Sequence, residues 1–228
     1  MTAETQKEFG LNSRSLLSLA PVAGVSIFFV LYFMSASRYS GGNSFDAQEP
    51  GFSLTRSFWC HLLREQCLNG QVNEGRPYAL ASMLVLAATM MVFWWLNANL
   101  LPLTKKQSRT MLFSGVPAAL IMIFIFTDLH DQVINISGIL AAPALYLTLV
   151  GLHRKGWKIL WVWGILNIGL VLLNNFLYYT PGFLIYLPVV QKLSFLSFLV
   201  WFGVTSLAHW KMPNCGFRTC LPESKVPD

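Results

Sequence analysis

Six long apolar runs dominate the chain, and short polar segments separate them. Each run has about 17 to 28 residues, the length that a helix needs to cross a hydrocarbon core of about 30 Å. The runs cover residues 16–36, 78–96, 111–127, 133–152, 157–178 and 183–210. The first is longer than the core of a cleavable signal peptide, so we expect it to stay as a helix. The pattern predicts an all-α polytopic membrane bundle of six transmembrane helices, forming a single domain over residues 1–228.

The longest polar segment, residues 37–77, joins the first two runs, and a polar tail covers residues 211–228. The segment is too aromatic for a disordered linker, since it carries Phe45, Phe52, Phe58 and Trp59. Apolar positions at 58, 59, 62, 63 and 67 have roughly helical spacing, and an Asn-Gly pair follows at 69–70. We therefore expect a short amphipathic helix over residues 57–68, lying at the membrane interface across the mouth of the bundle.

Composition agrees with a membrane protein, because 54% of the residues are hydrophobic and only 11% are charged, against about 25% in soluble domains. The net charge is +6, but the basic residues sit at the ends of the apolar runs rather than in a stripe, so we expect the lipid bilayer and no nucleic acid as a partner. Eleven basic residues fall on the side of the two termini and four on the other side. By the positive-inside rule both termini are cytoplasmic, and we expect a bacterial inner (cytoplasmic) membrane.

The long outer loop carries a motif. It opens on Pro50-Gly51-Phe52-Ser53 and closes on Asn69-Gly70 and Asn73 before the second run. With the six runs, this arrangement resembles a group of six-span membrane proteins of unknown function, similar to the FGF-receptor-activating-protein-like and damage-regulated-autophagy-modulator-like proteins. The resemblance covers about the first hundred residues and implies the six-span fold. Eukaryotic members of that group are associated with lipid-anchor remodelling and autophagy. Where relatives often have Ser-Asp/Glu-Leu-Gly in the short helix, this chain has residues 58–61, Phe-Trp-Cys-His.

Four polar residues of the outer face have the side chains of a metal site. His61 and Glu65 are four apart and would share one face of a helix, and Asp128 and His130 lie in the second outer turn. Two imidazoles and two carboxylates are suitable ligands for a divalent metal, so a metal cofactor is one hypothesis. In the alternative, His61 and Glu65 form a solvated interfacial pair and Asp128 caps the next helix. The chain has no His-Glu-x-x-His signature.

Lys192 is a basic residue inside the last apolar run. It lies nine residues after Phe183, about 14 Å below the outer edge at 1.5 Å per residue. An ammonium group at that depth needs a partner or a water-filled cavity. We expect a ligand site formed by Lys192 with Asp128, Gln191, Asn174 and Asn175. The alternative is that the last helix starts later and Lys192 extends to the interface.

These residues support three hypotheses about function. The first is binding or transport of a small anionic ligand or a lipid headgroup in an outward-facing polar cavity. The second is a membrane-embedded lipid-modifying enzyme that uses the outer His, Asp and Glu side chains, and the third is a non-catalytic structural or assembly protein. The chain has no nucleotide-binding loop and no nucleophile elbow, and the sequence predicts no particular oligomeric state. We expect free thiols at Cys60, Cys67, Cys215 and Cys220, because neither pair has metal-site spacing.

Overall fold

The computed structural model describes residues 16–211, and these residues form the all-α bundle that the sequence predicts. Six helical segments within this range are long and apolar enough to cross a membrane, so the protein is a multi-pass integral membrane protein. The segments consist of α2 (Ala20–Ser37), α3 (Arg76–Leu100), α4 (Lys105–Met122) with the 3₁₀ helix η2 (Ile123–Phe126), α5 (His130–Arg154), α6 (Lys158–Tyr179), and η3 (Leu184–Tyr186) with α7 (Leu187–Lys211).

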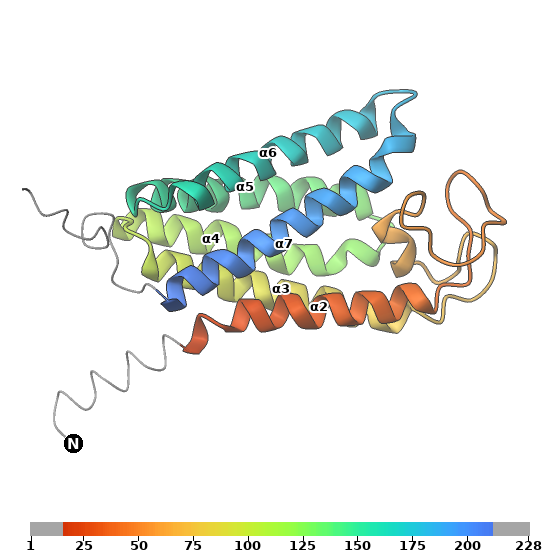
Figure 1. Cartoon of the computed structure of the whole chain (residues 1–228), viewed down its shortest axis with the longest axis horizontal. Helices are drawn as coiled ribbons and strands as arrows, with labels where there is room; N and C mark the ends of the chain where they lie inside the picture. Colours follow the sequence, from red (N-terminus) through yellow and green to blue (C-terminus); the bar gives the residue numbers. More distant parts are fainter. Residues whose placement is uncertain (1–15, 212–228) are drawn as a thin grey trace, which may run out of the picture.

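The helices run up and down and close into a ring. Each helix packs against the next along the chain, and α7 returns to pack against α2 (Figure 1). The weakest of these contacts is between α5 and α6. Residues 38–75 form a loop at one end of the bundle, called here the loop end, and the first and last described residues lie at the opposite end. At the loop end, the turn between α6 and α7 stands apart from α2 and α3.

Large aromatic side chains fill the half of the bundle away from the loop. Phe93 stacks on Phe202 with ring centroids 4.1 Å apart, and Trp94 and Trp201 complete the cluster. All four side chains are buried, and the Trp201 indole donates a hydrogen bond to the Leu160 carbonyl at 2.8 Å. Truncating one buried side chain of this size to alanine typically costs a protein about 3–5 kcal/mol of stability. The buried core continues from this aromatic cluster to the loop end, where it includes Phe28, Tyr32 and Leu62.

The loop is anchored on the bundle by Trp59. Its ring lies 3.7 Å from that of Tyr32 and 5.9 Å from that of Phe28, both on α2, and 4.8 Å from that of Phe195 on α7. Buried Tyr39 adds a second anchor, since its hydroxyl accepts a hydrogen bond from the Leu68 amide and donates one to the Gly42 carbonyl. The aromatic content of the loop thus orders it against α2 and α7, as the sequence suggested.

The prediction of a helix over residues 57–68 is wrong in its length. The structure has a single 3₁₀ turn, η1 (Trp59–Leu63), and Arg64 adopts an extended conformation. The reason is Asn73, whose Nδ2 donates to the carbonyls of Leu62 and Arg64, both at 3.0 Å. These carbonyls would otherwise accept the hydrogen bonds of a continuing helix, so the chain leaves the helix there.

Candidate functional site

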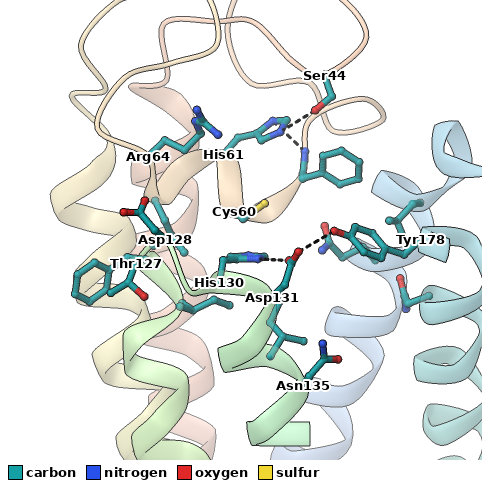
Figure 2. Close-up of a pocket in the computed structure, with 18 of the residues that line it drawn as sticks. Ser44, Cys60, His61, Arg64, Thr127, Asp128, His130, Asp131, Asn135 and Tyr178 are labelled. Carbon is teal, nitrogen blue, oxygen red and sulfur yellow. Dashed lines mark hydrogen bonds and ion pairs between the residues drawn. The ribbon is translucent and has the colours of Figure 1, made fainter.

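A cavity of about 1160 Å³ opens at the loop end, beneath η1. Its roof is the loop, and its walls are the η2–α5 turn, the last turns of α6 and the first turn of α7 (Figure 2). The cavity exists because α5 packs only loosely against α6, while α6 follows α7 away from the other helices at this end. Polar and apolar side chains are mixed in the lining, and the apolar ones include Ile125, Ile134 and Leu187.

The cavity lies close to the loop-end termini of the helices. The deepest lining residue of α5 is Asn135, and that of α6 is Asn174; each lies five residues from the loop-end terminus of its helix. At 1.5 Å per residue this corresponds to a depth of about 7 Å. For helices that end at the membrane surface, such a depth is that of lipid headgroups and the first acyl carbons rather than the centre of the bilayer.

All but one of the residues that the sequence singled out as candidates line this cavity. They come from the loop, from the η2–α5 turn and from two further helices: His61, Glu65, Asp128, His130, Asn174, Asn175 and Gln191. The fold thus gathers segments that are up to 130 positions apart in the sequence. The exception is Lys192.

Lys192 faces the loop instead of the cavity. Its ammonium donates hydrogen bonds to the Ser57 carbonyl and, at 3.2 Å, to the Pro188 carbonyl. It also lies 5.4 Å from the centre of the Phe52 ring. The neighbouring Gln191 accepts a hydrogen bond from the Trp59 amide at 3.2 Å. Adjacent residues of α7 therefore hold the two ends of the 57–59 segment, and Lys192 tethers the roof.

His61 is a buried structural residue of the roof, only 5% exposed. Its Nδ1 accepts a hydrogen bond from the Phe58 amide at 3.2 Å, and its Nε2 lies 3.3 Å from the Ser44 hydroxyl. Because a backbone N–H can only donate, Nδ1 is unprotonated and Nε2 carries the proton toward Ser44. Burial, with help from the positive charge of Arg64, lowers the pKa of His61 to about 4. His61 is therefore neutral and cannot act as a base toward Ser44.

The expected metal site does not assemble. Glu65 follows the extended Arg64, so it does not share a helical face with His61, and it pairs with Arg76 at 2.9 Å. Both nitrogens of His61 are already bonded. Within residues 16–211, no group of three or more His, Cys, Asp or Glu side chains has the arrangement of a metal site. The proposed ligands share one cavity but not one coordination centre.

A hydrogen-bonded chain crosses the cavity from α5 to α6. Nδ1 of His130 lies 3.1 Å from one carboxylate oxygen of Asp131, and the Tyr178 hydroxyl donates to the other at 3.2 Å (Figure 2). This chain links the two consecutive helices that pack least against each other. Further down the wall, Nδ2 of Asn174 donates to the Ser194 hydroxyl, while its Oδ1 is buried without a partner among the described residues.

Two charged lining residues have no partner among the described residues. Arg64 is exposed at the roof, and its guanidinium makes no ion pair or side-chain hydrogen bond within residues 16–211. Asp128 is exposed on the η2–α5 turn and is similarly unpaired in that range. It does not cap α5 as the alternative interpretation expected, since Leu129 is the N-cap and α5 has no side-chain cap.

Cys60 projects into the cavity from η1 (Figure 2). It is a free thiol, as is Cys67, which agrees with the sequence prediction; Cys215 and Cys220 lie outside the described residues. Burial raises the pKa of Cys60 to about 11, so the thiol is protonated at neutral pH and is a weak nucleophile. Because Cys60 lines the cavity, its reactivity with a thiol reagent reports whether the cavity is occupied.

Several polar lining residues were not among the sequence candidates, and Arg64 and Asn135 are two of them. Asp131 and Tyr178 adjoin candidates along the chain, but nothing in the sequence indicates that they meet across two helices. Asn135 carries the one signal that was available, since an amide five residues into an apolar helix needs a polar surrounding. Comparisons with protein-family models, curated proteins and solved structures give no match to this chain.

Proposed function

We propose that the protein binds the polar headgroup of an amphiphile, such as a membrane phospholipid, in the cavity beneath η1. The observation that carries the proposal is the position of the cavity. Its lining combines polar side chains with apolar ones such as Ile134 and Leu187, and it lies within about 7 Å of the loop-end termini of α5 and α6. An amphiphile offers both a polar headgroup and apolar carbons to such a lining. Lateral access is available between α5 and α6, where the lining residues Ile134 and Tyr178 are 39% and 47% exposed.

The charge distribution supports an orientation in which the loop end faces away from the cytoplasm. The opposite end carries Lys105, Lys106, Arg109, Arg154, Lys155, Lys158 and Lys211. The loop end carries Arg38, Arg56, Arg64, Arg76 and Lys192, and all six carboxylates of the described range. By the positive-inside rule the termini are cytoplasmic, and in a bacterial inner membrane the cavity would then open toward the outer leaflet.

The lipid-modifying alternative has less support. His61 is neutral and fully bonded, and Cys60 is a protonated thiol, so neither is an activated nucleophile or base. Only Nε2 of His130 is unbonded among the imidazole nitrogens of the cavity within the described residues. Binding without chemistry requires none of these groups to be activated, so it is the function we favour.

The test is lipid retention by a cavity-filling variant. The protein is reconstituted with equal amounts of phosphatidylethanolamine and phosphatidylglycerol, extracted in mild detergent, and analysed by native mass spectrometry. We expect about one tightly retained lipid per chain, and Asn135→Trp should abolish its retention because the indole occupies the cavity. Ile139→Trp is the matched control, one turn further along α5 at a side chain that is 74% exposed to lipid.

Labelling of Cys60 provides an independent measurement. Cys67, Cys215 and Cys220 are changed to alanine, and the reaction of Cys60 with N-ethylmaleimide is followed at pH 9 with and without added lysophospholipid. Occupancy should slow the labelling. Equal retention by both tryptophan variants, together with labelling that lipid leaves unchanged, would refute the proposal. Recovery of a chemically altered lipid would instead favour the enzyme alternative.

A further inference from the structure

The charged side chains that line the cavity divide into paired and unpaired groups. Glu65 is matched by Arg76, and Asp131 is bonded to both His130 and Tyr178. His61 is uncharged at neutral pH. After these are accounted for, one guanidinium and one carboxylate remain, those of Arg64 and Asp128.

The unpaired charges belong to different walls of the same cavity. Arg64 projects from the roof, and Asp128 projects from the η2–α5 turn on the same side of the view (Figure 2). A guanidinium presents a planar fork of donors that matches phosphate oxygens in a bidentate arrangement. A carboxylate with no other partner is suited to accept hydrogen bonds from a primary ammonium group. Both interactions are stronger next to low-dielectric walls than in bulk water.

We propose that the headgroup held in this cavity is zwitterionic, with a phosphate on Arg64 and a primary ammonium on Asp128, as in phosphoethanolamine. The inference rests on the proposed function and specifies its ligand. It departs from the anionic ligand that the sequence suggested, because the cation on which that expectation depended, Lys192, tethers the roof instead. A headgroup with only negative charge would leave Asp128 unpaired beside a like charge, which is unfavourable.

Competition between two lipids with the same acyl chains tests the inference. Native mass spectrometry compares the retention of phosphatidylethanolamine and phosphatidylglycerol by the wild-type protein and by Arg64→Gln and Asp128→Asn. One charge-assisted hydrogen bond corresponds to roughly a tenfold change in affinity, so we expect about a tenfold preference for phosphatidylethanolamine in the wild type. Asp128→Asn should remove the preference, and Arg64→Gln should weaken retention of both lipids.

Two control variants change charge at the loop end without touching the cavity. Arg56 pairs with Glu49 at 3.7 Å and Glu74 is exposed outside the cavity, so Arg56→Gln and Glu74→Gln should keep the wild-type preference. Soluble phosphoethanolamine is added in a parallel series. Displacement of the lipid by it at comparable concentration would identify the free headgroup compound as a sufficient ligand; failure to displace would identify the lipid.

The outcomes separate this inference from the proposed function. If phosphatidylglycerol is retained as well as phosphatidylethanolamine, or if Asp128→Asn keeps the wild-type preference, the zwitterionic assignment is wrong while the cavity still binds lipid. If neither lipid is retained and Asn135→Trp changes nothing, the proposed function itself fails. A preference that both Asp128→Asn and Glu74→Gln abolish would reflect the overall surface charge and would also overturn the assignment.

Discussion

Asn73→Ala should loosen the roof of the cavity. The Asn73 side chain makes three hydrogen bonds at 3.0–3.1 Å, donating to the Leu62 and Arg64 carbonyls and accepting from the Gly75 amide. It is only 3% exposed, so water does not replace these partners in the folded loop. At about 1 kcal/mol for each bond, the loop should lose about 3 kcal/mol of stability. That corresponds to an increase of roughly a hundredfold in the opening equilibrium.

Hydrogen–deuterium exchange in lipid nanodiscs measures this opening directly. Amides of residues 59–75 should exchange about a hundredfold faster in Asn73→Ala, while those of α3 and α4 keep their wild-type rates, because local opening does not require the bundle to unfold. Asn69→Ala is the matched control. Asn69 lies in the same loop, but its side chain oxygen accepts one local hydrogen bond, from the Gln71 amide. Equal exchange rates in the two variants, or a change spread over the whole bundle, would refute the reasoning.

Three further predictions follow from the packing. Burial lowers the pKa of His61 from 6.5 to about 4, so neutral His61 contributes about 3 kcal/mol to loop stability above pH 6.5, and this contribution is lost as the pH falls toward 4. Trp59 fluorescence should report the loss, and His61→Gln should remove this pH dependence. Gly24→Ala places a Cβ 2.0 Å from the Thr89 hydroxyl and should lower the free energy of unfolding by about 1–3 kcal/mol in thermal unfolding. The Cβ of Gly169→Ala meets nothing within 4 Å, so this variant should be neutral or mildly stabilising. Similar losses of stability in the two variants would contradict the prediction. Lys192→Met should speed exchange of residues 52–58 about tenfold but leave lipid retention unchanged, since Lys192 tethers the roof without lining the cavity; a loss of retention would place Lys192 back in the site.

If the cavity binds an amphiphile, the loop has a function beyond packing, because it covers the binding site. A roof fixed by Trp59, Asn73 and Lys192 covers the cavity, while the side between α5 and α6 stays accessible from the lipid. The chain His130–Asp131–Tyr178 is the polar link across that side. Opening of this link would therefore change access to the site without disturbing the aromatic core around Phe93 and Trp201.

The sequence by itself determined the membrane character and the six helices, because a hydrocarbon core allows only long apolar segments whose backbone groups bond internally. That constraint acts on each segment separately and can be read along the chain. It also indicated the side on which polar residues gather, so most candidates were found. The length of η1 could not be read in this way, since it depends on Asn73, ten residues beyond its end.

Only the tertiary structure decided what each polar side chain does. Lys192 and Gln191 are neighbours on α7, yet the first bonds the loop and the second also lines the cavity, a difference of about 100° around one helix. Arg64 and Asp128 became the relevant pair because Glu65 and Asp131 found partners on other elements. Pairing of charges depends on distances between segments far apart in the chain, and such distances are set by helix packing rather than by local sequence.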